Sequence, residues 1–254
     1  KEALIYDMYQ YLGADASLYN YAKISVNGEY WGVYLALEAV EDSFLLRNYG
    51  VQDGELYKPD SMNIGGGKDF GDFNADDIDF GDLDLDNLLR YMAVHVFSVN
   101  EDSLSGSMAH NYYLYEAGGK LNLIPWDYNL ALGGMGRSND ATSVVNDSID
   151  NAFSGTTFFD TLMENETYHS QYYAYLQQLI SEYINGGGFD AFYTRVRSQI
   201  DALVDASALD LSAMGYMNSG GGGGFDAPAA SETRTAPDVS DGPEHTPSAG
   251  FDPS

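Results

Sequence analysis

The sequence predicts an α+β fold, and three observations lead to that prediction. Two β-like runs flank Asn27-Gly28, a dipeptide typical of a two-residue hairpin turn. Two further β-like runs, at 112–115 and 121–124, are joined by a hairpin loop at 117–120. Elsewhere apolar residues recur every three or four positions, as they do in amphipathic helices. Separate hairpins and helices are typical of the α+β class.

The first part of the chain is divided into elements by glycine and proline. Gly13 and Gly50 are suited to end helices, and Pro59 stops a strand. The expected elements are a helix at 1–12, strands at 21–26 and 30–37, a helix at 39–49 and a strand at 56–58.

The second part of the chain is predicted to be mainly helical. A glycine- and aspartate-rich tract at 63–86 precedes it, and a segment at 219–254, rich in Gly, Pro, Ser and Thr, follows it as a disordered linker or tail. The expected helices lie at 83–99, 158–163, 169–184 and 189–206.

The charge of the chain restricts its partners. Eleven Lys and Arg face 39 Asp and Glu among 254 residues, a net charge of −28. This balance argues against nucleic acid and anionic membranes, and it fits a basic protein partner, divalent cations or a need for solubility. Cys is absent, and no run is long enough to span a membrane. The chain begins at Lys1 without Met and shows no export signal, so we expect a fragment of a longer protein.

One stretch of the chain carries the candidate chemistry. Asp102 and Asn111 precede the second hairpin and Asp127 follows it, so the hairpin can bring Asn111 at its entry close to Asp127 just past its exit. Carboxylate and amide oxygens suit Mg²⁺ or Mn²⁺ and a phosphate-bearing ligand. The plainer interpretation also stands at this point: an acid that caps a turn, an amide that begins a strand and an acid in a turn after proline.

Other chemistries have less support from the sequence. The Gly-Gly-Gly-Lys run at 65–68 lacks the phosphate-loop pattern, and the calcium-loop spacing at 72–76 lacks its final acid. The four histidines have no zinc spacing, and no GxSxG motif exists. Asp102 and Asp127 could form a glycosidase pair, but Asn111 would have no role there.

Two charged residues upstream are further candidates. Glu38 lies at a strand end, and Lys58 is one of the few basic residues. Lys58 could pair with Glu38 or contact a ligand phosphate, and the plainer interpretation is a surface ion pair that contributes little.

Several motifs together resemble the CotH family, spore coat protein H and its relatives. The resemblance covers roughly Lys1 to Ala208. Its motifs are Asn100-Glu101-Asp102-Ser103, His110-Asn111-Tyr112-Tyr113-Leu114-Tyr115, Pro125-Trp126-Asp127-Tyr128-Asn129, the run from Val26 to Tyr34 with Glu38, and Leu56-Tyr57-Lys58.

The resemblance implies an atypical protein-kinase-like fold that binds ATP and Mg²⁺ or Mn²⁺ and phosphorylates serine or threonine. It implies a domain at 1–218, with a partial, β-containing N-lobe at 1–62, the acidic loop at 63–86 and a mainly helical C-lobe at 87–218. Carried over, Asp102 is the catalytic acid, Asn111 and Asp127 are metal-binding, and Glu38 and Lys58 are cofactor-binding.

The family also sets expectations for partners and location. The implied substrate is a Ser-rich protein of the spore coat, cell surface or extracellular space, and the negative charge of the chain favours one that is also rich in Lys and Arg. Family members carry upstream strands, one with a lysine, that this chain lacks, so the nucleotide site of the fragment is expected to be incomplete. Two alternatives remain open: a non-catalytic adhesion module on the same fold, and another ATP-dependent transfer such as adenylylation.

Overall fold

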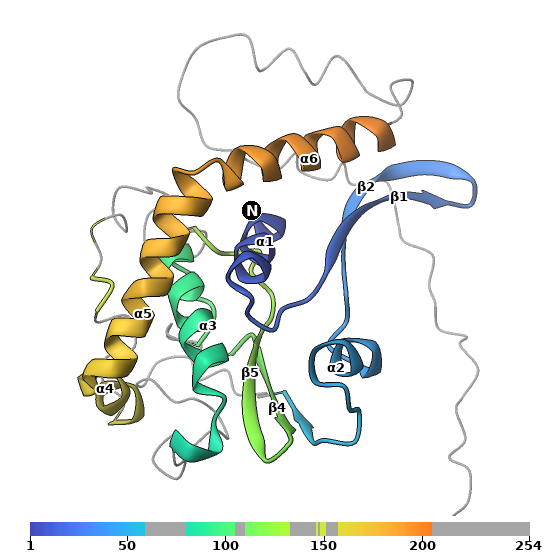
Figure 1. Ribbon diagram of the computed structural model, residues 1–254. Coiled ribbons are helices and arrows are strands. Elements are labelled where there is room, and N and C mark those ends of the chain that lie inside the picture. Colours follow the sequence, from blue (N-terminus) through green and yellow to red (C-terminus); the bar gives the residue numbers. More distant parts are fainter. Residues whose placement is uncertain (59–79, 105–109, 133–145, 147, 151–156, 205–254) are drawn as a thin grey trace, which may run out of the picture. The chain divides into compact units, whose positions relative to one another are not determined.

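The computed structural model describes residues 1–58, 80–104, 110–132, 146, 148–150 and 157–204 (Figure 1). The described residues belong to one compact unit, Lys1–Ser212. Several predicted features lie outside them: most of the glycine/aspartate tract, the phosphate-loop and calcium-loop candidates, and the C-terminal tail.

The described residues form a mixed helical and antiparallel structure, which confirms the predicted α+β class. The helices are α1 (Glu2–Leu12), α2 (Asp42–Tyr49), α3 (Leu85–Ser98), α4 (Thr157–Glu164), α5 (Glu166–Gln178) and α6 (Gly188–Leu203), with a 3-10 turn at Phe80–Asp82 and a π-helical turn, η4 (Leu179–Ile184). The strands are β1 (Tyr19–Val26), β2 (Glu29–Leu37), β3 (Leu56–Tyr57), β4 (Tyr112–Ala117) and β5 (Lys120–Pro125).

Local sequence explains where several helices begin and end. Gly13 and Gly50 adopt the left-handed conformation that ends α1 and α2, and glycine does so without steric cost. At the start of α3, the side chain of Asp84 accepts a hydrogen bond from the backbone N–H of Asn87. The helix predicted at 169–184 begins earlier, at Glu166, and continues as the π-helical turn from Leu179.

The strands form two separate antiparallel sheets. In the first, β1 pairs with β2 from Tyr19↔Leu37 to Val26↔Glu29, and Asn27 and Gly28 both have positive φ, as the predicted turn requires. The second has the order β3-β4-β5. Its β4–β5 turn is Gly118-Gly119, again with positive φ at both residues. β3 pairs with β4, so the strand predicted at 56–58 belongs to the sheet of the second hairpin.

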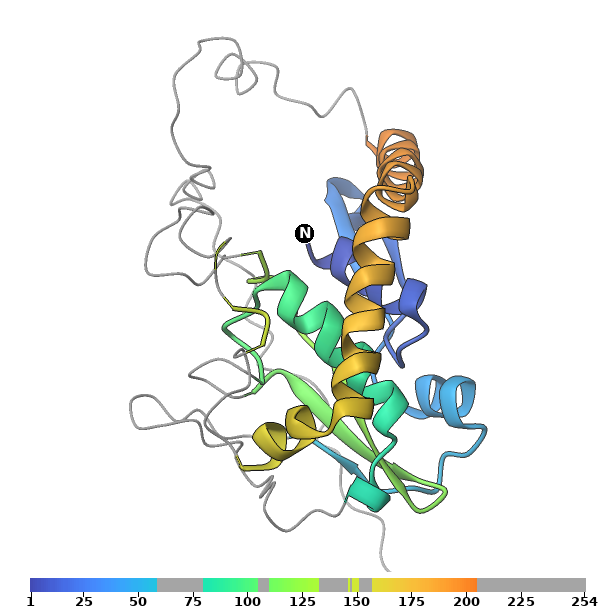
Figure 2. The same cartoon turned by 60° about the vertical axis from the view of Figure 1, so that its left-hand side comes forward.

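Helix α3 lies at the centre of the main core. It packs against α5, α1 and β5, and Figure 2 shows it crossing between α5 and the β4–β5 hairpin. A smaller apolar cluster joins α2 to the β4–β5 hairpin, through Phe44 and Leu45 against Tyr115 and Ile124. The second hairpin is therefore supported by two groups of apolar side chains.

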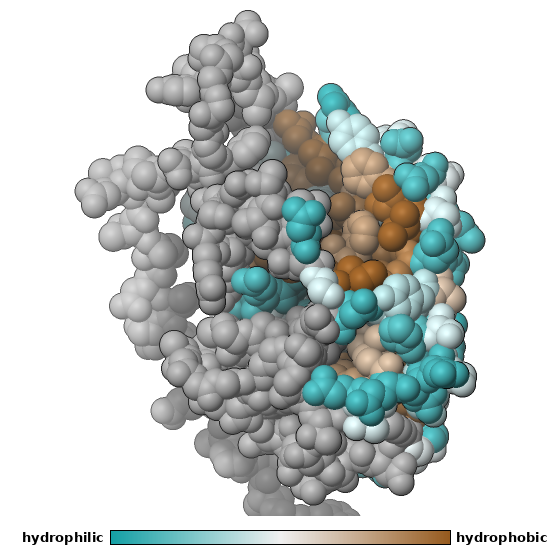
Figure 3. Space-filling model, turned by 90° about the vertical axis from the view of Figure 1, so that its left-hand side faces the viewer, coloured by the Kyte–Doolittle hydropathy of each residue, from teal (hydrophilic) through white to brown (hydrophobic). Residues whose placement is uncertain are grey.

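The surface mixes polar and apolar groups. On the face shown in Figure 3, hydrophilic residues border apolar ones that reach the surface. No helix within the described residues has both the length and the apolar character needed to cross a membrane.

Candidate functional site

Asp102 and Asn111 are in direct contact. The Nδ2 of Asn111 donates to the Asp102 carboxylate Oδ2 at 2.9 Å and to its backbone carbonyl at 3.1 Å. Asp102 lies just after α3 in a turn where its N–H donates to the side chain of Asn100 at 3.3 Å. Ser103 adds a bond from its Oγ to the Asn111 carbonyl at 3.2 Å. The contact thus joins the end of α3 to the start of β4.

The base of the β4–β5 hairpin brings Asn111 beside the Asp127 segment. Tyr112 pairs with Pro125, and the backbone N–H of Trp126 donates to the Asn111 carbonyl at 3.2 Å. Both Asn111 and Asp127 have positive φ, 63° and 51°. Asn and Asp tolerate this left-handed conformation better than other non-glycine residues, and such strain is common at functional sites. The hairpin therefore has the predicted geometry.

The carboxylates of the site influence each other. Burial raises the pKa of the Asp102 carboxyl, and the nearby charge of Asp127 raises it further. The electrostatic effect of His110 and the hydrogen bond from Asn111 act in the opposite direction without cancelling the rise. Asp102 is only 8% exposed, so it is held in a buried and negatively charged environment.

Glu2 is a third carboxylate near this site, and the sequence analysis missed it. Burial raises the pKa of Glu2, and the charge of Asp127 adds to this rise. A hydrogen bond from the backbone N–H of Tyr128 to the Glu2 carboxylate opposes it. Glu2 lies in the first turn of α1, where an acid is favoured by the helix dipole, so its type and position carried no signal of a site.

The donor set fits a hard divalent cation. Since the Nδ2 of Asn111 faces Asp102, the amide Oδ1 is the atom left to act as a ligand, alongside the half-buried carboxylate of Asp127. Mg²⁺ favours a few protein oxygens completed by water and phosphate. Within the described ranges, no group of three or more His, Cys, Asp or Glu gathers to hold a metal. The candidate ligands at this site are the amide of Asn111 and the carboxylate of Asp127.

Comparison with known proteins places the chain in a family. The family model described as CotH kinase protein matches residues 1–79 and 81–220. The chain belongs to the CotH kinase family. It is also similar to "Inner spore coat protein H" of Bacillus subtilis (strain 168), with 29% identity over 171 residues that cover 52% of this chain and 46% of that protein. The match therefore spans about half the length of that curated relative.

Lys58, a candidate from the CotH resemblance, lies beside the base of the hairpin. Its Nζ is 5.4 Å from the ring centroid of Tyr113 and 5.9 Å from that of Trp126, and the two rings meet edge to face at 5.5 Å. Trp126 directly precedes Asp127. An ammonium group over aromatic faces is stabilised electrostatically, and this exposed one remains accessible to a ligand.

Glu38, the other residue that the CotH resemblance makes cofactor-binding, pairs with Arg47, whereas the sequence analysis considered Lys58. It forms an ion pair with Arg47 at 2.5 Å and accepts the N–H of Leu18 at 3.0 Å. Burial would raise the pKa of Glu38, but these donors lower it overall. Pairing between Glu38 and Lys58 was therefore wrong, because α2 brings Arg47 to the end of β2. The adenine-side role of Glu38 stays a prediction.

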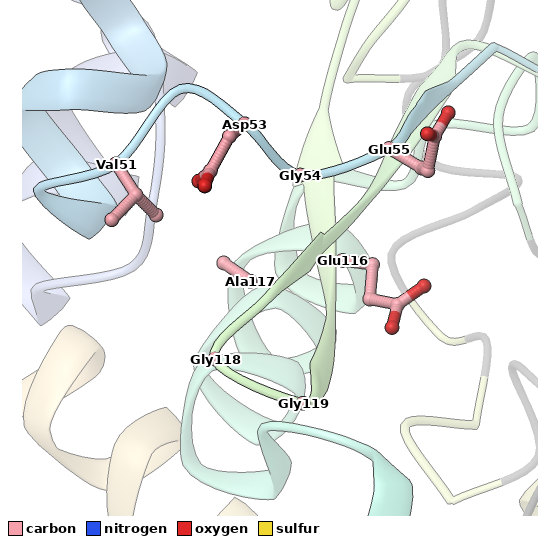
Figure 4. Close-up of a pocket in the computed structure, with 8 residues that line it drawn as sticks. All are labelled: Val51, Asp53, Gly54, Glu55, Glu116, Ala117, Gly118 and Gly119. Carbon is pink, nitrogen blue, oxygen red and sulfur yellow. The ribbon is translucent and has the colours of Figure 1, made fainter.

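A shallow acidic pocket is formed by residues other than Asp102, Asn111 and Asp127. It is formed by the loop at 51–55 and the Gly118-Gly119 turn of the second hairpin. Figure 4 shows that its carboxylates diverge: Asp53 points to one side of β4, and Glu55 and Glu116 point to the other. The pocket therefore lacks converging ligands for a cation.

Proposed function

We propose that this CotH-family chain carries the catalytic site of an atypical protein kinase. It would use ATP with Mg²⁺ or Mn²⁺ and phosphorylate serine or threonine. The observation that supports this most is the contact of Asn111 with Asp102 at 2.9 Å, at the base of the same hairpin that ends at Asp127. One acid, one amide and a second acid are the parts that phosphoryl transfer requires.

Asp102 is proposed to act on the substrate hydroxyl. Its carboxylate orients the Ser or Thr oxygen and accepts its proton as that oxygen bonds to the γ-phosphorus and the bond to the β,γ-bridging oxygen breaks. The raised pKa makes Asp102 a better proton acceptor than an exposed aspartate. Asn111 holds the carboxylate in one orientation through its Nδ2. A metal ion held by Asn111 Oδ1 and Asp127 would neutralise the negative charge of the phosphates.

Lys58 and Glu38 are proposed to serve ATP. The position of the Lys58 ammonium beside Trp126, next to Asp127, supports contact with a nucleotide phosphate. Glu38, fixed by Arg47 at the end of β2, is proposed to lie near the adenine.

The proposed substrate is a Ser- and Lys/Arg-rich protein of the spore coat or cell surface. The net charge of −28 would attract a basic partner. The name of the Bacillus subtilis relative, an inner spore coat protein, supports this location.

A phosphate-transfer assay tests the proposal. The full chain is incubated with radiolabelled ATP, Mg²⁺ or Mn²⁺, and a peptide rich in serine and lysine. We expect labelled peptide, loss of labelling in Asp127→Ala and normal labelling in Glu116→Ala, whose acid is exposed and lies near the turn of the same hairpin. No transfer by the unaltered chain, or equal transfer by Asp127→Ala, would contradict the proposal.

Two other outcomes of this assay have a clear meaning. A mass increase equal to an adenylyl group would identify a different ATP-dependent transfer. Partner binding that survives both Asp102→Ala and Asp127→Ala, without transfer, would identify a non-catalytic module.

A further inference from the structure

Tyr128, the residue after Asp127, is fully buried and held from two sides. Its hydroxyl lies 2.5 Å from the hydroxyl of Tyr9 and 2.9 Å from the Nδ1 of His95. Tyr9 comes from α1 and His95 from α3. Because buried polar groups are costly without partners, these contacts give Tyr128 one strongly preferred position.

One stripe of α1 faces the Asp127–Tyr128 segment. Glu2, Tyr6 and Tyr9 are spaced at i, i+4 and i+7 and so share one helix face. The rings of Tyr6 and Tyr9 meet Tyr128 edge to face, at centroid distances of 6.2 and 5.3 Å. Glu2 accepts the backbone N–H of Tyr128. The helix therefore contacts the segment at its backbone, its ring and its hydroxyl.

The same buried cluster reaches Asp102 and Asn111. The ring of Tyr91 stacks on Tyr9 at 5.8 Å and on His95 at 5.4 Å, and its hydroxyl lies 3.5 Å from the Oγ of Ser103. Ser103 follows Asp102 and bonds the Asn111 carbonyl. Burial lowers the pKa of His95 to about 3, so its ring is neutral near neutral pH and its bond to Tyr128 does not depend on protonation there.

We propose that Tyr9, His95 and Tyr128 are positioning residues that hold the Asp127 carboxylate where it binds metal. The proposal rests on the proposed metal role of Asp127. Asp127 has a left-handed backbone, a strained conformation that persists only when its surroundings impose it. The buried hydroxyl cluster that follows provides this constraint, and it makes α1 a structural support of the site.

Two conservative variants test the proposal, with a matched control. Tyr128→Phe and Tyr9→Phe each remove one buried hydroxyl and keep the ring. Tyr172→Phe likewise removes the hydroxyl of a fully buried tyrosine, one in α5 whose partly buried hydrogen bond to the Ile149 carbonyl is 2.8 Å long. We expect Tyr128→Phe to weaken Mn²⁺ binding about 10-fold, a typical effect of losing a residue that orients a ligand. Tyr172→Phe should bind Mn²⁺ as the unaltered chain does.

A second measurement needs neither metal nor ATP. The titration of the Asp102 carboxyl, followed by NMR, reports the nearby charge of Asp127. Asp127→Asn should lower the midpoint, and both Tyr128→Phe and Tyr9→Phe should move it in the same direction, whereas Tyr172→Phe should not. An unchanged or raised midpoint in both tyrosine variants would overturn the proposal. Lack of phosphate transfer by the unaltered chain would instead count against the proposed function, so the two failures are distinguishable.

Discussion

The β1–β2 and β4–β5 hairpins share one local design and differ in their surroundings. Each has two antiparallel strands joined by a two-residue turn with positive φ. β1 and β2 make a sheet of their own, with large apolar side chains such as Trp31 and Tyr34 about half exposed. In the second hairpin β4 also pairs with β3, and the hairpin is covered by α3 and α2.

The acids at the bases of the two hairpins differ in the same way. Glu38 follows β2 and is bound by the guanidinium of Arg47. Asp102 is held at the base of the second hairpin by the uncharged amide of Asn111. A carboxylate neutralised by arginine is a weak proton acceptor, whereas one held by an amide beside another acid is a better one. The partner of each hairpin acid thus decides whether it is suited to accept a proton.

The largest expected difference is in activity. Asp102→Asn keeps an acceptor for the Asn111 amide but removes the proposed base, so kcat should fall by about 10²–10⁴-fold. Glu29→Gln, an exposed change at the tip of the first hairpin, should leave kcat unchanged. Rates of phosphate transfer with saturating ATP measure both, and equal rates for Asp102→Asn and the unaltered chain would show that Asp102 is not the base.

Substitution of an apolar residue should destabilise the protein more in the second hairpin than in the first. Leu123 in β5 is 4% exposed, and Leu123→Ala should cost about 2–5 kcal/mol of unfolding free energy. Ile24 in β1 is 38% exposed, and Ile24→Ala should cost less than about 1 kcal/mol. Denaturant unfolding measures both values. Similar costs would mean that the first hairpin is as well packed as the second.

Glycine substitutions should have smaller effects with different causes. A Cβ at Gly54 would lie 1.9 Å from the carbonyl oxygen of Glu116, so Gly54→Ala should push β3 away from β4 and cost about 1–3 kcal/mol. At the first hairpin, a Cβ at Gly28 meets no atom within 4 Å, but φ is 85°, so Gly28→Ala should cost about 1 kcal/mol through backbone strain alone. Thermal unfolding of both variants checks the order.

The smallest expected effects are the changes in stability with pH caused by Asp102 and Glu38, and these have opposite signs. The pKa of Asp102 is raised in the fold, so its ionisation costs stability as pH rises from the unfolded-state pKa through the folded one. Asp102→Asn should therefore be more stable than the unaltered chain at neutral pH, with the gain lost at acidic pH.

Glu38 should behave in the reverse way. Its pKa is lowered, so its stabilisation is present above the unfolded-state pKa and is lost as pH falls through the folded one. Glu38→Gln should be less stable at neutral pH, with the loss disappearing in acid. Urea unfolding between acidic and neutral pH tests both variants. If Asp102→Asn and Glu38→Gln changed the unfolding free energy in the same direction at neutral pH, the difference between the two hairpin acids would be contradicted.

The elements set by local sequence could be predicted. Asn27-Gly28 and the glycines after α1 and α2 have left-handed backbone conformations. Few residue types adopt this conformation without cost, so the residue type indicates the local backbone conformation. The approach of Asn111 to the segment of Asp127 followed from the hairpin.

Contacts between distant segments could not be predicted from these signals. Arg47 reaches Glu38 only because α2 folds back on the end of β2. Tyr128 is one of 21 tyrosines, and a tyrosine has the same local preferences whether its hydroxyl is buried or exposed. Glu2 and Tyr9 face Tyr128 because α1 packs beside α3, which depends on the whole core.

Binding of Mn²⁺, followed by the electron paramagnetic resonance signal of the free ion in the presence of ATP, tests the central claim most directly. We predict that the chain removes Mn²⁺ from solution, that Asp127→Asn weakens this binding at least about 10-fold, and that Glu116→Gln does not. The acidic surface alone would bind Mn²⁺ equally in all three proteins. Equal binding by Asp127→Asn and the unaltered chain would contradict a metal site at the base of the second hairpin.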